Sequence, residues 1–572
     1  MNFEKLKWLN KYIYQINNLT EKVDLFLVGG LIRDIILGKT NPSDVGDKLD
    51  LDFATSWEPD PIWEKLNKNK TDDISIFRTA KYGTMTIIDK SNNDNKIEIT
   101  PFRTESSYSD GRHPDEITWS DDIYLDSQRR DFTMNCIYYT MIGIGAERAE
   151  KAKWVEKAEK TERVNASLSE KQLEKLEKTG YIYMSDIKLL IIQSSQIISD
   201  IYKNGKFDVN KLYGYIWVAE WVEKAKMAEW VGLLIDLHKG IQDIYSHKIR
   251  AVGNPDSRFF EDSLRILRGI RFASCQEGFD IESKTWRSMK KLYFLVRRLS
   301  KERIHEEIVK TFKWPNPFWY IVMMDELNLM KYIFPSVWHL KWLNQPVKYH
   351  PMDVWHHTIM VLRAWQQLSD DYLVRLGCLY HDVGKTEQYY AQWFLGKDDL
   401  EFVYGSWLNH VNSGAEFAED DFARIGFSNA EAETIWRYVK NHMKPWEILM
   451  SKESNQMPKL RKMVAEKWFE MCRNVVKICL ADRRGQFNPI QTKELEQPRE
   501  LMTKLDILEK NEWQFTMKNL AVNGQVLMEE LGLKPGPELG ELIKKAYWYV
   551  LDDLNRNDRS KLVKYCEKLI KG

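Results

Sequence analysis

The sequence lacks the features that mark secreted, disulfide-bonded or membrane-spanning proteins. Only six cysteines occur among 572 residues and none forms a Cys-x-x-Cys pair, so neither a disulfide framework nor a zinc knuckle is predicted. No apolar run reaches the roughly 18 residues that a membrane-spanning helix needs. The opening segment, MNFEKLKWLNKY, lacks the apolar core of a signal peptide. We therefore expect a cytoplasmic protein without membrane contact.

A charge excess of either sign is also missing. The 84 Lys and Arg residues balance 84 Asp and Glu residues, which gives a net charge of zero. This neutrality argues against a protein that coats long nucleic acids non-specifically. It leaves open RNA binding through a locally basic surface. The length exceeds that of a single hydrophobic core, so several domains are expected.

The first 140 residues have the patterns of a mixed β-sheet with a few helices. Residues 23–28 (VDLFLV) predict a buried strand that ends at Gly29 and Gly30, and residues 31–38 predict the following helix. Residues 84–89 and 96–102 alternate in polarity on either side of SNNDN, which is typical of a hairpin.

Most of the remaining chain has helical patterns. Residues 144–230 are rich in Ala, Glu, Lys and Trp, and the pentapeptide WVEKA occurs there twice. This composition predicts amphipathic helices with solvated charged faces.

Two aspartates on one predicted strand provide the first candidate site. Asp50 and Asp52 are two positions apart, and this spacing places both side chains on the same face of a strand. Two neighbouring carboxylates repel each other unless a cation lies between them, and Mg²⁺ prefers such ligands together with phosphate oxygens. The turn at Gly29 and Gly30 would let the backbone approach a phosphate, and Arg33 on the next helix could hold it.

These features and several later segments resemble the class II tRNA nucleotidyltransferases and bacterial poly(A) polymerases, of the polymerase-β-like nucleotidyltransferase superfamily. The similar segments are LVGGLIRDIILG (27–38), DLDFAT (50–55), RTAKYGTMTI (78–87), IEITPFRTE (97–105), YSDGRHPDEI (108–117), RRDFTMN (129–135), IRAVGNPDSRF (249–259) and EDSLRILRGIRFA (261–273).

The resemblance implies roles for individual residues of the head. Asp50 and Asp52 would be the metal-binding catalytic carboxylates, and Glu98 would orient or deprotonate the RNA 3′ hydroxyl. Gly29, Gly30 and Arg33 would hold the triphosphate. Arg129 would contact the sugar and phosphates.

The segment EDSLRILRGIR implies a protein template for the incoming base. On one helix, Asp262 and Arg265 would share a face and present an acceptor and a bidentate donor to a Watson–Crick edge. Arg268 and Arg271 would support this pair or the phosphates. From spacing alone, an ordinary intrahelical salt bridge is the simpler interpretation.

Histidines and aspartates of a second segment resemble the HD phosphohydrolase motif. The residues in family order are His357, His381, Asp382, His410, His442 and Asp482. Imidazole and carboxylate groups from several helices suit a divalent metal of undetermined identity inside a bundle. The chemistry implied is attack of metal-activated water on a phosphoester; an inert scaffold that touches tRNA is the alternative.

We therefore predict an α+β protein: a polymerase-β-like nucleotidyltransferase head with a mixed β-sheet, followed by an all-α neck, an HD bundle and a tail. The predicted divisions are 1–140 (catalytic head), 141–230 (helical insertion), 231–345 (neck with the nucleotide-selecting helix and tRNA-binding region), 346–490 (HD domain) and 491–572 (helical tail).

The implied function is addition of C, C and A to the tRNA 3′ end from CTP and ATP, without a nucleic-acid template, by Mg²⁺-dependent two-metal chemistry. Three alternatives remain open. A poly(A) polymerase is disfavoured by the lack of a basic signature after the carboxylates, where this chain has IFRTAKYGT. A partial enzyme that adds only CC or only A is the second. An HD phosphohydrolase that uses the head only to bind RNA is the third.

Overall fold

The computed structural model describes residues 24–39, 50–79, 82–91, 96–106, 116–143, 181–184, 189–192, 202–203, 206–207, 230–343, 352–365, 368, 371–387, 410–486, 497–512 and 516–571. The chain divides into two compact units, Met1–Leu299 and Ser300–Gly572.

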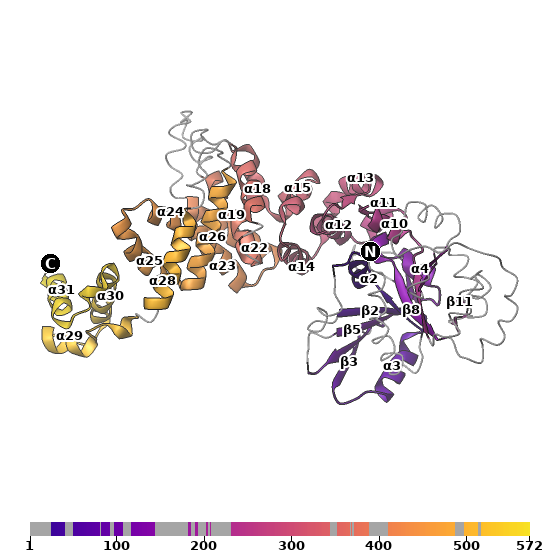
Figure 1. Cartoon of the computed structure of the whole chain (residues 1–572), viewed down its shortest axis with the longest axis horizontal. Coiled ribbons are helices and arrows are strands. Elements are labelled where there is room, and N and C mark those ends of the chain that lie inside the picture. The colour runs from indigo at the N-terminus through magenta and orange to yellow at the C-terminus, as the bar shows by residue number, and fades with distance from the viewer. Residues whose placement is uncertain are drawn as a thin grey trace. The chain divides into compact units, whose positions relative to one another are not determined.

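A nine-stranded sheet forms the core of the first unit (Figure 1). Its strand order is β3-β4-β5-β2-β1-β8-β13-β10-β9. All four residues of β1 are buried, and β1 lies between β2 and β8 in the sheet. The strands are β1 (Leu25–Val28), β2 (Asp50–Thr55), β3 (Ile74–Arg78), β4 (Met85–Asp89), β5 (Lys96–Pro101), β8 (Tyr138–Gly143), β9 (Tyr181–Met184), β10 (Leu189–Ile192) and β13 (Trp230–Ile235).

Both parallel and antiparallel pairs occur in this sheet, which confirms the predicted mixed topology. β4 and β5 pair antiparallel, as the alternating pattern predicted, and β5 pairs parallel with β2. A parallel pair needs a crossover connection; here it contains α3 (Pro59–Lys68), which buries Ile62 and Leu66. The topology therefore brings β2 and β5 side by side.

Helices and short strands make up the rest of the described first unit, and some of them are labelled in Figure 1. They are α2 (Gly30–Ile36), β6 (Arg103–Ser106), β7 (Glu116–Trp119), α4 (Ile123–Gln128), the 3₁₀ turn η3 (Thr133–Asn135), α10 (Gly240–Tyr245), β14 (Lys248–Ile249), α11 (Pro255–Glu261), α12 (Leu264–Cys275), β15 (Asp280–Ile281), α13 (Ser283–Leu292) and η5 (Tyr293–Arg298).

The described parts of residues 144–230 are strands, where the composition predicted helices. β9 and β10 contain YIYM and LLII, and β11 (Tyr202–Lys203) and β12 (Lys206–Phe207) form a two-residue ladder. Short runs of aromatic and branched residues favour strands over helices. The remainder of this region, including both WVEKA copies, lies outside the described residues.

Strand β13 begins at the end of that region and belongs to the head sheet. It pairs antiparallel with β8 and parallel with β10. The sheet of the head thus continues beyond the predicted boundary at residue 140.

Helix α12 packs closely onto the head. A Cβ atom added at Gly269 would lie 2.9 Å from the Cζ of Phe132 and would also collide with Met289. Because a larger residue would displace α12, Gly269 permits the close approach of α12 to both the head and α13.

The described part of the second unit is helical, as the sequence predicted (Figure 1). The division at Leu299 assigns the predicted neck partly to each unit. The elements of the second unit are α14 (Lys301–Phe312), α15 (Phe318–Glu326), α16 (Met330–Ile333), α17 (Pro335–Trp338), η6 (His339–Trp342), α18 (Val354–Ala364), α19 (Tyr372–Tyr380), α22 (His410–Ile425), α23 (Asn429–Asn441), α24 (Lys444–Leu449), α25 (Glu453–Lys467), α26 (Phe469–Gly485), α28 (Pro498–Glu512), η9 (Met517–Asn519), α29 (Gly524–Leu531), α30 (Pro537–Asp552), η10 (Leu554–Arg556) and α31 (Arg559–Lys571).

The tail helices have a hydrophobic core of their own, which includes Leu527, Ala546, Val550 and Leu562. Within the part of the chain that the structure describes, no helix combines the length and apolar character needed to cross a bilayer.

Candidate functional site

A glycine turn and a carboxylate meet at the end of β1. Gly29 has φ of +99°, a left-handed conformation that favours glycine. A Cβ atom at Gly29 would lie 3.6 Å from Oδ2 of Asp52. The Asp52 carboxylate therefore faces the turn that begins α2.

The neighbouring strand supplies a second carboxylate. Asp52 is the register partner of Glu98 in the parallel pair of β2 and β5. Asp52 is exposed while Leu51 and Phe53 are buried, so the expected alternation is present. The Glu98 carboxylate forms an ion pair with Lys96. Asp50 begins β2, but its side chain lies outside the described part of the chain.

Arg33 is buried and held by the protein in this structure. Its Nε and Nη2 donate to the Asp34 carboxylate at 2.8 and 2.9 Å, and its Nη1 donates to Oδ1 of Asn135 at 2.6 Å. A Cβ atom at Gly30 would lie 3.3 Å from Nη2 of Arg33. The guanidinium group therefore lies against the same glycine turn that Asp52 faces.

Arg129 belongs to a buried cluster around Asp126. Its Nε donates to Oδ1 of Asp126 at 2.8 Å, while Oδ2 accepts from Arg130 at 3.0 Å and from the Tyr138 hydroxyl at 2.8 Å. Burial alone would raise the pKa of Asp126, but the two guanidinium groups and the Tyr138 hydroxyl lower it to about 2. Arg129 is thus held by Asp126, and its Nη1 also lies 3.7 Å from Oε1 of Glu105 on β6.

The expected continuous helix through EDSLRILRGIR is wrong at Asp262. Helix α11 ends at Glu261, Asp262 is extended with φ of −144°, and α12 begins at Leu264. The Asp262 carboxylate accepts a hydrogen bond from the N–H of Leu264 at 3.1 Å, across the N-cap residue Ser263 of α12. Such a local side-chain bond to the backbone competes with a continuous helix.

The ion-pair partner of Arg265 at the start of α12 is Glu261. Nη1 of Arg265 donates to Oε2 of Glu261 at 2.9 Å, and its Nη2 donates to the backbone oxygen of Arg129 at 2.7 Å. Sequence reasoning missed Glu261, although its spacing of four residues from Arg265 is typical of helical ion pairs. The bond to Arg129 connects α12 to the head.

Arg268 also joins α12 to the head, through Asp131. Its Nε and Nη2 lie 2.8 and 2.7 Å from Oδ2 of Asp131. Burial would raise the pKa of Asp131, but Arg268 outweighs it and lowers the pKa to about 2. Arg271 lies one turn from Arg268, with its guanidinium carbon 4.4 Å from the centroid of the Phe272 ring.

The six predicted HD residues converge in the second unit. They lie on or at the ends of α18, α19, α22, α23 and α26, and form two groups of candidate metal ligands: His357, His381 and Asp482, and Asp382, His410 and His442. Each helix contributes one side chain or one adjacent pair.

Asp382 bridges the two groups. Its Oδ2 lies 3.2 Å from Nε2 of His381, and its Oδ1 lies 3.3 Å from Nε2 of His410. In the first group Oδ1 of Asp482 is 3.0 Å from Nε2 of His357. Asp382 therefore lies between two sets of candidate metal ligands.

The ligand atoms of these histidines are better suited to binding a metal ion than to hydrogen bonding with one another. Nε2 of His357 lies 3.2 Å from Nε2 of His381, and the corresponding atoms of His410 and His442 are 3.3 Å apart. Facing imidazole nitrogens can share only one proton, whereas a cation accepts both lone pairs. Burial lowers the pKa of His442 to about 3, which favours the neutral form that binds metals.

Two further residues of this centre escaped the sequence reasoning. Buried Lys385 places its Nζ 2.6 Å from Oδ2 of Asp382. Gly384 lies so close to α22 that an added Cβ would collide with the backbone oxygen of His410. Both belong to the segment HDVGK (381–385), whose last two residues were not assigned a role.

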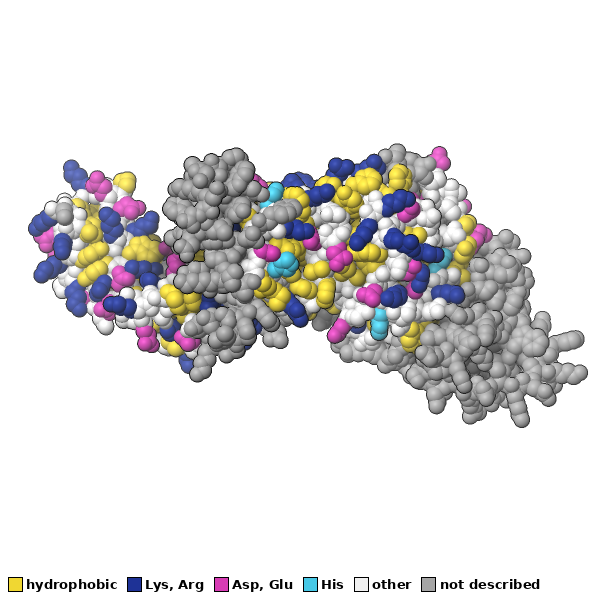
Figure 2. Space-filling view, turned by 90° about the horizontal axis from the view of Figure 1, so that it is seen from above, with side chains coloured by type: hydrophobic (Ala, Val, Ile, Leu, Met, Phe, Trp, Pro, Cys, Tyr) yellow, Lys and Arg dark blue, Asp and Glu magenta, His cyan; other side chains and the backbone are white. Residues whose placement is uncertain are grey.

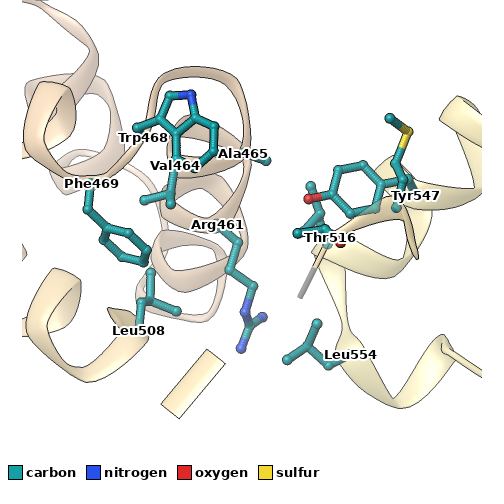
Figure 3. Close-up of a pocket in the computed structure, with 11 residues that line it drawn as sticks. Arg461, Val464, Ala465, Trp468, Phe469, Leu508, Thr516, Tyr547 and Leu554 are labelled. Atoms are coloured by element: carbon teal, nitrogen blue, oxygen red, sulfur yellow. The ribbon is translucent and has the colours of Figure 1, made fainter. Parts of the chain in front are cut away.

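A cavity of about 280 Å³ lies elsewhere in the second unit, between the helices α25, α26 and α28 and the tail elements (Figure 3). Trp468 at its edge is 82% exposed and has φ of +69° and ψ of +156°, a strained conformation for a tryptophan. None of the predicted site residues lines this cavity.

Four family models match the chain in order. Residues 25–149 match "Poly A polymerase head domain" and residues 278–341 match "Probable RNA and SrmB-binding site of polymerase A". Residues 354–484 match "HD domain", and residues 430–566 match the model for tRNA nucleotidyltransferase domain 2. The head and the HD domain that the sequence motifs indicated are therefore confirmed.

Curated relatives agree with these domains. The chain is 30% identical over 287 residues to a CCA-adding enzyme of Enterococcus faecalis, which covers 50% of this chain and 45% of the relative. It thus spans about half the length of that relative. It is 24% identical over 552 residues to a CCA-adding enzyme of Ligilactobacillus salivarius, covering 96% and 93% of the two chains.

A solved structure supports the fold. The crystal structure of the Bacillus stearothermophilus CCA-adding enzyme in complex with CTP aligns with a TM-score of 0.55 and 17% identity, over 100% of this chain and 98% of that one. At this identity the likeness shows the shared nucleotidyltransferase fold.

Proposed function

We propose that this chain is a CCA tRNA nucleotidyltransferase, which adds C, C and A to a tRNA 3′ end from CTP and ATP without a nucleic-acid template. The observation that carries the proposal is the position of the Asp52 carboxylate, which faces the Gly29 turn and is paired in register with Glu98. The named relatives and the match of residues 430–566 to tRNA nucleotidyltransferase domain 2 support this activity over others of the same head fold.

The head carboxylates are proposed to hold Mg²⁺. Asp50 and Asp52 come from one strand, and oxygen ligands on a rigid strand suit a small hard cation that also binds phosphate. When bound, the metal would neutralise charge on the triphosphate and lower the pKa of the attacking hydroxyl. Glu98 is proposed to orient the RNA 3′ hydroxyl, and its carboxylate is paired with Lys96.

The glycine turn and the arginines are proposed to hold the nucleotide. Gly29 and Gly30 allow phosphate oxygens to approach the backbone N–H groups at the start of α2. Arg33 lies at the same turn, and Arg129 is proposed to contact the sugar and phosphates.

Base selection is assigned to Asp262 and Arg265, with Arg268 and Arg271 in support. The Arg265 guanidinium is held in place by Glu261 and the Arg129 carbonyl. A fixed guanidinium fork distinguishes bases because its donors match only some acceptor patterns. Asp262 and Arg265 lie on the two sides of the helix break, at the end of α11 and the start of α12.

The basic surface of α13 and η5 is proposed to bind the tRNA backbone. Figure 2 shows Lys and Arg side chains gathered beside hydrophobic ones on the face seen from above. Phosphate contacts of this kind provide affinity without reading sequence. The residues are Lys284, Arg287, Lys290, Lys291, Arg297 and Arg298, with Trp286 and Phe294 among them.

A second activity, metal-dependent phosphoester hydrolysis, is proposed for the HD centre. The observation that favours it is the convergence of six ligand side chains in two groups bridged by Asp382. The bound divalent metal would supply an activated water for attack on phosphorus. A 2′,3′-cyclic phosphate or a damaged RNA end is the proposed substrate class.

The transferase proposal is tested with the full chain and a tRNA that lacks its 3′ terminal CCA. Each nucleoside triphosphate is supplied separately and in combination, and the product ends are sequenced. Ordered addition of C, C and A supports the proposal. Long A tails would instead indicate a poly(A) polymerase, and addition limited to CC or to A would indicate a partial enzyme.

The hydrolase proposal is tested separately with an RNA that ends in a 2′,3′-cyclic phosphate. His381→Ala should abolish its opening and leave nucleotide addition intact. Equal hydrolysis by the wild type and this variant would contradict the assignment.

A further inference from the structure

Phe272 on α12 lies at the centre of three arginines that come from two parts of the fold. The guanidinium carbons of Arg271, Arg33 and Arg268 lie 4.4, 5.0 and 5.5 Å from the centroid of its ring. The ring is 5% exposed and packs edge-to-face on the fully buried Phe132, with centroids 5.8 Å apart. Phe272 therefore has a fixed orientation with respect to the head.

A series of hydrogen bonds connects two of the arginines that contact this ring, Arg33 and Arg268. Nη1 of Arg33 donates to Oδ1 of Asn135 at 2.6 Å, and Nδ2 of Asn135 donates to Oδ1 of Asp131 at 3.2 Å. Asp131 in turn accepts from Nε of Arg268 at 2.8 Å. Arg33 and Arg268, at the two ends of this series of hydrogen bonds, both lie against the Phe272 ring.

The aromatic ring adds an attraction that the carboxylates do not supply. Arg33 is paired with Asp34 and Arg268 with Asp131, but neighbouring guanidinium groups still repel one another. The π-face of a ring attracts cations without carrying a net charge, and the attraction strengthens away from water. Phe272 thus holds the three guanidinium groups together without adding further negative charge.

The cluster adjoins the proposed catalytic turn. Nη2 of Arg33 would lie 3.3 Å from a Cβ atom at Gly30, and Asp52 would lie 3.6 Å from one at Gly29. The two consecutive glycines therefore separate the metal-binding carboxylate from the arginines. A triphosphate at this turn would have the carboxylate-bound cation on one side and the arginine cluster on the other.

We propose that Phe272 is a positioning residue for the incoming nucleoside triphosphate, because its ring holds Arg33, Arg268 and Arg271 in the arrangement that receives the phosphates. The inference rests on the proposed transferase function. Phe272 need not touch the nucleotide itself, since it acts through the arginines.

The test compares variants of the full chain at Phe272 with a matched control. Phe272→Leu keeps an apolar side chain but removes the π-face, whereas Phe272→Trp keeps the π-face. Phe279→Leu is the control, because Phe279 is similarly buried in the neck and packs edge-to-face on the His247 ring at 5.0 Å. Each variant is assayed for KM and kcat with CTP and with ATP, and for thermal unfolding.

We expect Phe272→Leu to raise the KM for both nucleotides by about 5- to 30-fold, with kcat changed less than about threefold. Phe272→Trp should restore KM to within about threefold of the wild type. If Phe272→Leu is unfolded, Phe272→Met is used in its place. Equal KM shifts in Phe272→Leu and Phe279→Leu, or no restoration by Trp, would overturn the inference.

Failure of the proposed function is recognised independently. If the wild type adds no nucleotide to tRNA, the transferase proposal fails, and calorimetric binding of Mg·CTP still compares Phe272→Leu with Phe279→Leu. A loss of affinity confined to Phe272→Leu supports the positioning role. Equal affinities in the two variants contradict it.

Discussion

Asp52 and Glu98 are directly opposed on adjacent parallel strands, yet their surroundings differ. Asp52 faces the Gly29 turn, whereas Glu98 is paired with Lys96. Because parallel register partners leave the sheet on the same face, both carboxylates reach the same space. The two carboxylates therefore share one face of the sheet but have different partners.

The first prediction concerns this pair. Asp52→Asn should reduce nucleotide incorporation by at least about a thousandfold, because it removes a proposed ligand of the metal that stabilises the transition state. Glu98→Gln should reduce kcat by about 10²-fold, which is typical of a lost general base. Labelled CTP incorporation measures both. Asp60→Asn on the exposed surface of the same unit serves as the control and should retain full activity.

A second prediction concerns Glu261, the carboxylate that holds Arg265. Glu261→Gln should lower the selectivity for CTP and ATP over UTP and GTP by about tenfold, since the guanidinium loses a charged anchor; Arg265→Ala should lower it further. Misincorporation assays with single nucleotides measure the ratio. Glu277→Gln, at an exposed position in the same unit, should leave it unchanged. Faithful addition of C, C and A by Arg265→Ala would remove the base-selecting role.

The helix break at Asp262 shows where sequence reasoning reached its limit. EDSLRILRGIR contains helical spacing, and no proline interrupts it, so a continuous helix was the natural prediction. The interruption comes from the Asp262 side chain, which accepts the N–H of Leu264. A sequence pattern does not reveal whether an aspartate side chain will bond to the backbone in this way or continue the helix.

Other parts of the site followed from the sequence because their spacing has one physical meaning. The alternation Leu51, Asp52, Phe53 predicts that the two apolar side chains are on one face of a strand and Asp52 on the other. In the structure Leu51 and Phe53 are buried and Asp52 is exposed. The HD residues lie at or near helix ends, and their order in the motif was sufficient to identify them. Lys385 was not predictable, since burial of a lysine beside Asp382 depends on five helices packing together.

The third prediction uses two glycines with opposite environments. Gly384→Ala should force the HD turn away from the His410 backbone, with which an added Cβ would collide, and should lower both metal content and thermal stability. Gly540→Ala, in α30 with no atom within 4 Å of the added Cβ, should instead stabilise its helix by about 0.5–1 kcal/mol. Calorimetric unfolding compares the two. Equal destabilisation would contradict the packing argument.

A fourth prediction concerns the pH dependence of the head. Asp126 and Asp131 both have a pKa lowered to about 2, so their charged forms stabilise the fold above the ordinary aspartate pKa. This stabilisation, about 2 kcal/mol for each group, should be lost as pH falls from about 4 to 2. Hydrogen exchange of α4 and β8 measures it. Asp126→Asn should flatten the dependence in that window, whereas Asp280→Asn, at an exposed carboxylate, should not.

The fifth prediction concerns metal content. The chain dialysed against Zn²⁺ or Mn²⁺ should retain two ions at the HD centre, one for each group of ligands. His357→Ala should lose at least one of them, while His356→Ala should keep both, because the exposed His356 side chain is paired with Asp353 and belongs to neither ligand group. Elemental analysis measures the stoichiometry. Full occupancy in His357→Ala would exclude His357 as a ligand.

Strand β8 pairs with β1 on one side and with β13 on the other. During translation, β8 leaves the ribosome long before β13. Until β13 has been synthesised, the edge of β8 that pairs with β13 has no partner strand. Unpaired edges of this kind recruit other strands. The nascent head would therefore be most vulnerable to aggregation while residues 144–230 are being synthesised, and chaperone binding should concentrate in that period.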